Sequence, residues 1–382
     1  MSITVREAIE LKSLRNFKLL AGEHGLDRDI IKIGILDYEK DEYVEKNFDE
    51  GEFIISSLLV VKDNPEELEA LVKKMISIGI AGLAIKNIYF KEVPQNIIDL
   101  CNKEEFPIFV YGDVYYEEVM IDVLEALRLS RERDALSERV EAILYHNLKN
   151  RAIEKVAYEM NRSFMDKNIV AYCIPKVKKE DMKGFWYKTE KDYPGSKIIP
   201  FNGGYIFIST FDKIDPLEAE EVVERRIRNS GVDRSKYYIG IGTLHRELGE
   251  LNYSIREAVY AARFSRIYNK NISKFGGLGA NKLILPILDD PWVKRYYEDI
   301  ILPIMRYDEK NDTQLLETAK IYIEKNGDIK ATAEQIFQHG NTVRYRIDRI
   351  YKLLEKTNSP INYYEDLAMA IRIYSLLKQG TL

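Results

Sequence analysis

Apolar residues recur at helical spacing in two short segments near the carboxyl end of the chain. The predicted buried positions are Ala333, Ile336 and Phe337 in the first segment, and Val343, Ile347, Ile350 and Leu354 in the second. Positions in the second set are four, three and four residues apart, which places them on one face of an α-helix. Two short helices with facing apolar stripes predict a helix-turn-helix between Ala331 and Leu354.

A short polar turn joins the two predicted helices. Gln338, His339 and Gly340 give a connection of the length that joins helices at a steep angle, and glycine is free to take a positive φ. Asn341 is then the predicted N-cap of the second helix, because its side-chain oxygen can accept a hydrogen bond from an amide of the first turn.

The polar face of the second helix carries the candidate chemistry. Between residues 341 and 356 there are five basic and two acidic side chains, which leaves about three net positive charges. Basic side chains that neutralise phosphates, together with a helix N-terminus, supply much of the affinity of a nucleic-acid interface. A solvated helix of an ordinary bundle explains the charge alone equally well. The candidate nucleic-acid contacts are His339, Asn341, Thr342, Arg344, Tyr345, Arg346 and Arg349.

Closer to the amino end, apolar runs alternate with helical patterns. The runs FIISSLLVV, IAGLAIK and PIFVYG are separated by segments that open with Asn64–Pro65 and with Pro94. This order predicts an α/β domain with at least partly parallel strands, and such sheets bind small ligands at the carboxyl ends of their strands. The alternative is that polar residues there only end the strands. The candidate ligand contacts are Ser56, Ser57, Lys86, Asn87, Tyr111 and Asp113.

The segment from about residue 114 to residue 160 contains no proline or glycine, which predicts one or two long helices. Its near-heptad apolar residues fit either a short parallel dimer seam or a connecting helix packed on its own domains. These residues are Met120, Val123, Leu127, Leu136, Val140 and Ile143.

A second alternating region follows. The runs NIVAYCIPK, WYKTEKDYP, KIIPF, YIFIST and YYIGIGT are predicted strands, and a hairpin turn is predicted at 202–204. Helical patterns precede and follow YYIGIGT, so the region is a second α/β or α+β unit. Gly240 and Gly242 suggest a dinucleotide loop, but His245 holds the third glycine position.

The run AEQIFQHGNTVRYRIDRI resembles the carboxyl-terminal DNA-binding domain of PucR-type (purine-catabolism regulator) bacterial transcription factors. His339, Asn341, Thr342, Tyr345 and Arg346 match the motif of the family, whereas Gly340 departs from it and removes one expected phosphate contact. The runs SITVREAIEL, AGEHGLDRDI and EGEFIISS resemble the amino-terminal domain of the family. GIGTLHRELGELNYSIREAVYAARFSR resembles its middle domain, which is regarded as a distant GGDEF-like relative of nucleotide cyclase folds.

The resemblance implies a multidomain α/β protein with four parts. These are an α/β sensor domain (1–113), a helical linker (114–162), a degenerate GGDEF-like α+β middle domain (163–290) and an all-α helix-turn-helix domain (291–382). It implies a ligand-responsive regulator of catabolic genes that binds double-stranded DNA as a dimer or higher homo-oligomer. Asn341, Thr342, Tyr345 and Arg346 would contact bases, and His339, Arg344 and Arg349 would contact phosphates. The effector stays unassigned, because relatives control varied catabolic genes.

Enzyme chemistry is not expected. In FNGGYIFI, Tyr205 and Ile206 stand where an acidic pair would hold Mg²⁺ in an active cyclase, and neither residue can ligate magnesium. The four histidines are isolated in sequence, so we predict no metal site, no catalytic residues and no cofactor. A nucleotide-processing enzyme acting through the middle domain and a protein-interaction scaffold stay as alternatives.

Composition narrows the class of protein. A chain of 382 residues suggests two or three domains. With 57 basic against 62 acidic residues, the net charge of −5 means that DNA contacts must come from a local patch. Cys101 and Cys173 lie in apolar runs, which predicts buried thiols in a reducing compartment. Apolar runs are shorter than the ~20 residues that span a bilayer. We therefore expect a cytoplasmic protein.

Overall fold

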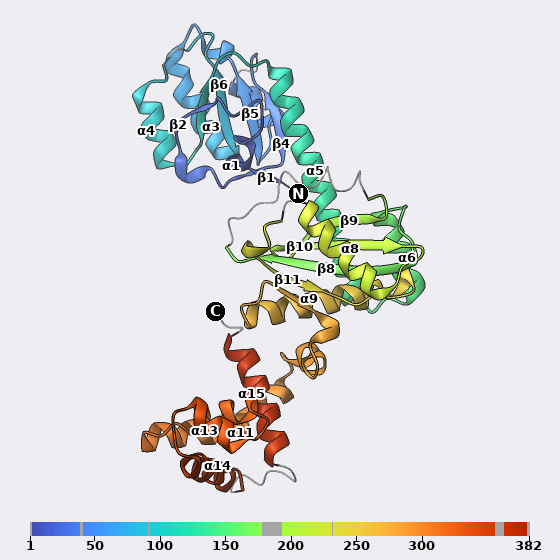
Figure 1. Ribbon diagram of the computed structural model, residues 1–382. Helices are drawn as coiled ribbons and strands as arrows, with labels where there is room; N and C mark the ends of the chain where they lie inside the picture. Colours follow the sequence, from blue (N-terminus) through green and yellow to red (C-terminus); the bar gives the residue numbers. More distant parts are fainter. Residues whose placement is uncertain are drawn as a thin grey trace. The chain divides into compact units, whose positions relative to one another are not determined.

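The computed structural model describes residues 2–38, 41–90, 92–177, 193–230, 232–355 and 363–379. The chain divides into two compact units, Met1–Glu138 and Arg139–Leu382. Figure 1 shows their helices and strands and labels many of them. None of the helices in the described part of the chain combines the length and apolar character needed to cross a bilayer.

The amino-terminal unit contains a five-stranded sheet with the strand order β2-β7-β6-β5-β4. Strands β4 to β7 pair in parallel, and β2 joins β7 antiparallel at one edge. The predicted α/β alternation is confirmed. A small antiparallel pair of β1 (Ile3–Thr4) and β3 (Asp29–Ile30) stands apart from the sheet. The sheet strands are β2 (Lys18–Ala21), β4 (Lys32–Ile35), β5 (Glu52–Ser56), β6 (Gly82–Lys86) and β7 (Ile108–Tyr111). The helices that precede or alternate with these strands are α1 (Val5–Ala8), α2 (Asp41–Asn47), α3 (Leu68–Ile78) and α4 (Gln95–Lys103).

Both faces of this sheet are covered by apolar side chains, as expected of largely parallel strands. Ile54 packs with α3 and α4 on one face, and Ile55 packs with the first turns of α5 (Tyr116–Tyr145) on the other. Val123 and Leu127 of α5 belong to this second core. The predicted heptad positions therefore pack inside their own domain here, which favours the connecting helix over the dimer seam.

The second unit begins with the end of α5 and α6 (Asn150–Met160), followed by a sheet of order β12-β11-β8-β10-β9. Its pairs are antiparallel except for β11 with β12. The hairpin predicted at 202–204 is confirmed, but its turn has two residues, Asn202 (φ 44°) and Gly203 (φ 72°), which both take the positive φ of a type I′ turn, and Gly204 already belongs to β10. The predicted strand WYKTEKDYP lies, apart from its last two residues, outside the described residues. The strands are β8 (Lys167–Pro175), β9 (Ser196–Phe201), β10 (Gly204–Phe211), β11 (Tyr237–Ile241) and β12 (Ile272–Lys274).

Helices cover both faces of the second sheet. Ile239 and Ile241 pack with α8 (Pro216–Asn229). Gly240, between them, faces the opposite side and meets α9 (Leu251–Ile267). A Cβ atom on Gly240 would clash with the backbone of Ala262, so the glycine permits close packing of a helix on a strand. The Gly240–Gly242 pattern therefore has a packing explanation. A short helix, α10 (Asn281–Ile284), follows β12.

The chain ends in a helical bundle. Asp290 and Asp328 cap the first turns of α11 and α13 by accepting hydrogen bonds from backbone amides. The bundle core takes apolar side chains from α11 to α15. The predicted buried set of the second helix (Val343, Ile347, Ile350 and Leu354) is confirmed, because all four side chains lie in this core. The helices are α11 (Pro291–Asn311), α12 (Leu315–Glu324), α13 (Ile329–Gln335), α14 (Gly340–Glu355) and α15 (Tyr363–Gln379).

Candidate nucleic-acid interface and ligand site

The turn between α13 and α14 differs in detail from its prediction. It spans residues 336–339, four residues instead of three, because the amides of Thr342 and Val343 already donate to the carbonyl of His339. Asn341 therefore lies inside α14, and its prediction as the N-cap is wrong. Its side-chain oxygen instead accepts a hydrogen bond from Nη1 of Arg344 at 3.2 Å. Gly340 has no positive φ; among the residues of this turn, Phe337 takes the left-handed conformation (φ 53°).

The predicted burial of Phe337 is also wrong, since the side chain is 93% exposed. Ala333 is buried as predicted, whereas Ile336, also predicted to be buried, is only half-buried. Helix α13 ends at Gln335, and the left-handed backbone at Phe337 turns its side chain away from the core. Helical periodicity no longer applies once the helix has ended, which is why the sequence pattern failed at this position.

The exposed face of α14 and the preceding turn hold most of the predicted nucleic-acid contacts. Tyr345 is 67% exposed, and His339, Asn341 and Arg344 are also exposed. Thr342 is half-buried. These side chains surround the amino end of a helix, where unpaired amides and the helix dipole favour anions. The geometry therefore suits contacts with a phosphate backbone and with base edges.

Arg346 and Arg349 are turned toward the bundle instead. Nη1 of Arg346 donates to Oγ1 of Thr318 in α12 at 2.9 Å. The guanidinium of Arg349 lies over the ring of Tyr307 in α11, 4.8 Å from its centroid. Both arginines are half-buried. These contacts join α14 to α12 and α11. The two arginines therefore do not belong to the exposed face of α14.

A groove of about 660 Å³ borders this face, and it was not foreseen from the sequence. It lies between the start of α13, the exposed Phe337 ring and the first turn of α14. Because its lining depends on where α13 ends, no local sequence signal could have identified it. The polar and aromatic residues that line it are Asp328, Lys330, Glu334, Phe337, Gln338 and Arg344.

The amino-terminal sheet brings the predicted ligand contacts to one edge. Lys86 and Tyr111 are register partners at the ends of β6 and β7, and Ser56 ends β5. The Ser56 hydroxyl donates to the carbonyl of Leu36 and accepts from the amide of Leu58, so it closes a turn. Asn87 and Asp113 follow β6 and β7, and Asp113 is exposed.

Sequence reasoning missed two residues at this edge, Asp37 and Tyr116. Oδ1 of Asp37 accepts from the backbone amide of Ser57 at 3.0 Å, from the Ser57 hydroxyl at 2.8 Å and from the Tyr116 hydroxyl at 3.3 Å. Asp37 follows β4, a strand that was not among the predicted ones. A polar residue after an apolar run, as in GILD, was the signal that could have found it.

Tyr111 holds a buried hydroxyl at the same edge. The residue is 3% exposed, its hydroxyl has no hydrogen-bond partner in the described part of the chain, and its ring stacks on Phe17 with centroids 4.2 Å apart. Burial, and then the proximity of Tyr116 and Asp37, raise the pKa of this hydroxyl well above its usual value. Burial raises the pKa of Tyr116 to about 12. Both phenols are therefore neutral hydrogen-bond donors at physiological pH.

Comparisons with known protein families match two segments of the chain. Residues 7–127 match the purine catabolism regulatory protein-like family, and residues 315–373 match the PucR C-terminal helix-turn-helix domain. Both matches are to domains of PucR-type regulators. The first match contains the sheet of the amino-terminal unit, and the second contains α13 and α14.

Two relatives from Bacillus subtilis (strain 168) are similar over part of their length. The purine catabolism regulatory protein is 25% identical over 149 residues, which cover 38% of this chain and 27% of the relative. The proline-responsive transcriptional activator PutR is 32% identical over 119 residues, 30% of this chain and 29% of the relative. Each match thus spans less than a third of the relative. A solved structure, the regulator of polyketide synthase expression from Bifidobacterium adolescentis, aligns with 63% of this chain and 97% of its own at 14% identity, with a TM-score of 0.28.

In the β9–β10 hairpin, Tyr205 and Ile206 occupy the positions where an active cyclase would need acidic residues. Tyr205 is half-buried and Ile206 is buried. Among the described residues, no group of three or more histidine, cysteine, aspartate or glutamate side chains is placed to hold a metal ion. One cluster of ionisable groups near β11 is His245 with Glu250 and Glu257.

Glu257 gives this cluster a predicted pH dependence. Burial opposes its ionisation, but the His245 ring, whose Nε2 lies 3.3 Å from Oε2 of Glu257, and hydrogen bonds from Thr243 outweigh burial and leave the pKa of Glu257 below its ordinary value of 4.5. A lowered folded-state pKa means that the ionised form stabilises the fold above about pH 4.5, and that this stability is lost as the pH falls through the folded-state pKa. Urea unfolding of the Glu257→Gln variant should show a weaker loss of stability between about pH 5 and pH 3 than the unmodified chain. Equal pH profiles would contradict this role of Glu257, and Glu141→Gln, at an exposed position, is the matched control.

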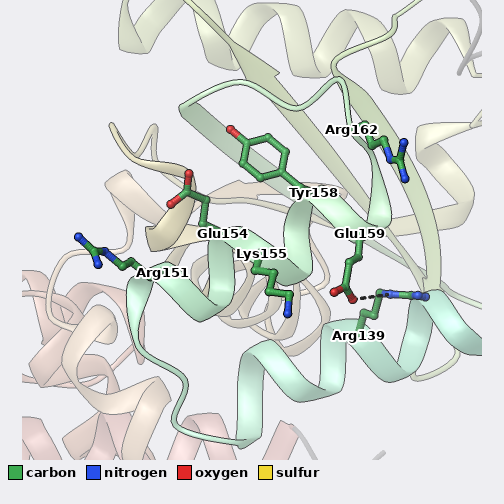
Figure 2. Close-up of a pocket in the computed structure, with 7 residues that line it drawn as sticks. All are labelled: Arg139, Arg151, Glu154, Lys155, Tyr158, Glu159 and Arg162. Atoms are coloured by element: carbon green, nitrogen blue, oxygen red, sulfur yellow. Dashed lines mark ion pairs between the residues drawn. The ribbon is translucent and has the colours of Figure 1, made fainter.

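A second groove, of about 580 Å³, lies where α6 faces the end of α5. Figure 2 shows Arg151 and Lys155 on α6, Arg162 on the segment after it, and Arg139 of α5 turned toward Glu159, its ion-pair partner at 3.7 Å. Because acidic side chains are mixed with the basic ones and the cations do not converge, the groove does not assemble an anion site. Its lining residues are Arg139, Arg151, Glu154, Lys155, Tyr158, Glu159 and Arg162.

Proposed function

We propose that the chain is a ligand-responsive transcription regulator that binds double-stranded promoter DNA through α14. The observation that carries this proposal is the exposed polar face at the amino end of α14, within a helix-turn-helix of the PucR type. Both relatives are regulators by name, and PutR is a proline-responsive transcriptional activator. A DNA-binding regulator of this kind works in the bacterial cytoplasm.

In this proposal the amino end of α14 enters the major groove. Asn341, Thr342 and Tyr345 contact base edges, and His339 and Arg344 contact phosphates. Arg346 and Arg349 could reach DNA only by leaving Thr318 and Tyr307. We therefore assign these two arginines to positioning α14.

The proposed regulator binds DNA as a homodimer or higher oligomer. One recognition helix contacts few bases and few phosphates, and helix-turn-helix proteins generally combine two copies on a pseudo-palindromic site. The division into sensor (1–113), linker (114–162), middle (163–290) and DNA-binding (291–382) domains belongs to the same proposal. So does a GGDEF-like origin of the middle domain, which would serve a structural or dimerising role because its hairpin lacks acidic residues.

Fluorescence anisotropy with DNA from the region upstream of the gene tests this function. Tyr345→Ala should weaken binding to the preferred sequence by about 1 to 3 kcal/mol, the usual size of a base-edge contact. Arg344→Ala should weaken binding to all sequences alike and lower the salt slope by about one unit. Neither change should affect stability, because both side chains are exposed.

Tyr145→Ala is the matched control, since Tyr145 is also 67% exposed but lies in α5. It should leave DNA affinity unchanged. Binding that survives loss of both Arg344 and Tyr345, with the same salt dependence, would overturn the assignment of α14 as the recognition helix.

A further inference from the structure

We infer that the carboxyl ends of β5, β6 and β7 bind a small organic carboxylate through the Tyr111 hydroxyl and the Lys86 ammonium group. This inference rests on the proposed function, because it names the chemical class of ligand that the sensor domain detects. Tyr111 and Lys86 are register partners on adjacent parallel strands, so their side chains reach the same sheet edge.

The two groups share a need for an acceptor. A buried hydroxyl without a partner is costly, and in native proteins it commonly marks a site completed by water or a ligand. Tyr111 carries such a hydroxyl. Lys86 packs its ammonium group 5.3 Å from the ring centroids of both Tyr115 and Tyr116, and the structure gives it no ion pair with a described carboxylate. A ligand anion would satisfy both.

Asp37 decides between a carboxylate and a phosphate. Its Oδ1 atom fixes Ser57 and Tyr116 at the edge of the site, so its negative charge lies close to the ligand position. A doubly charged phosphate would be repelled more strongly by that charge than a singly charged carboxylate. Lys86 supplies one positive charge, which balances a singly charged ligand, whereas Glu117 and Glu118 in the first turn of α5 offset the positive end of that helix.

Ligand binding is coupled to α5 in this arrangement. The Tyr111 hydroxyl is covered by its surroundings, so the ligand must displace a neighbour to reach it. Tyr116 is the candidate, because its ring lies beside the Lys86 ammonium group and the contact of its hydroxyl with Asp37 is a long 3.3 Å. It is also the first residue of α5, the helix that continues beyond the sensor. Movement of Tyr116 would therefore displace the first turn of that helix.

Isothermal titration of the full chain with paired probes tests the inference. The probes are the sodium salts of α-amino, 2-oxo and hydroxy acids, each paired with its neutral primary amide, and inorganic phosphate. At least one carboxylate should bind, with at least tenfold weaker binding of its amide and no binding of phosphate. Binding of the amide with equal affinity, binding of phosphate alone, or no binding by any carboxylate would overturn the inference.

Two variants distinguish loss of carboxylate binding from loss of the fold. Lys86→Met and Tyr111→Phe should each weaken carboxylate binding at least tenfold. Tyr111→Phe keeps the ring that stacks on Phe17 and removes only an unpartnered hydroxyl, so the thermal unfolding temperature should not fall. Lys103→Met, at an exposed position of α4, is the control and should bind normally. Unchanged binding by Lys86→Met and Tyr111→Phe would also overturn the inference.

The DNA measurement distinguishes failure of this inference from failure of the proposed function. Variants at Lys86 and Tyr111 should still bind promoter DNA in the absence of carboxylate. A chain that binds DNA but no carboxylate refutes the ligand class alone, whereas a chain that binds a carboxylate but no DNA refutes the proposed regulator.

Discussion

Replacing Gly240 by alanine should remove about 3 kcal/mol or more from the free energy of unfolding of the second unit, at the upper end of the usual cost of overpacking. The added Cβ atom would clash with the backbone nitrogen of Ala262 and the backbone carbonyl oxygen of Ala258, both in α9. Backbone atoms cannot rotate away as a flexible side chain can, so the whole helix would have to move off β11. Urea unfolding followed by circular dichroism measures the loss.

Gly277→Ala is the control for this prediction. No atom lies within 4 Å of the position of its Cβ, and its φ is not in the left-handed region, so the change should stay within about 0.5 kcal/mol of the unmodified chain. Equal stability of the two variants would contradict the packing explanation of Gly240. It would also return weight to the alternative of a nucleotide-binding loop at Gly240–Gly242, which nucleotide titration of Gly240→Ala would then test.

Periodic patterns predicted the elements of this fold well, because buried residues recur at a fixed spacing within each helix or strand. The four apolar positions of α14 recur with the period of a helix and all lie in the bundle core. The hairpin at Asn202 and Gly203 was also predictable, since few residue types tolerate positive φ at both positions of a type I′ turn. In each case, the residues that specify the structure are neighbours in sequence.

Predictions failed where the outcome depended on contacts between distant parts of the chain. Phe337 was assigned to the helix period, but α13 ends before it. Nothing in the sequence indicated that Thr318, 28 residues away, accepts a hydrogen bond from Arg346, whose contact with DNA stays a prediction. At the ligand edge, the sequence predicted the strand ends but not Asp37 and Tyr116, which are 79 residues apart and joined only by the fold.

Replacing Ile350 by alanine should remove about 2 to 5 kcal/mol from the free energy of unfolding of the carboxyl-terminal bundle, the usual cost of truncating a fully buried isoleucine. Ile350 is fully buried in the core that α14 shares with its neighbours. Thermal unfolding measures this loss, and DNA binding should disappear at temperatures where the bundle has melted and persist below them.

Phe337→Ala is the control for Ile350→Ala. Both residues are large and apolar, but Ile350 is fully buried in α14, whereas Phe337 is exposed in the turn that precedes α14. The Phe337 ring is 93% exposed, so its removal should change stability by less than about 0.5 kcal/mol. Equal destabilisation by both changes would mean that the turn packs differently from the structure. If Ile350→Ala instead lowered DNA affinity while leaving the unfolding temperature intact, the buried and exposed faces of α14 would have to be exchanged, and Tyr345 could not be a groove contact.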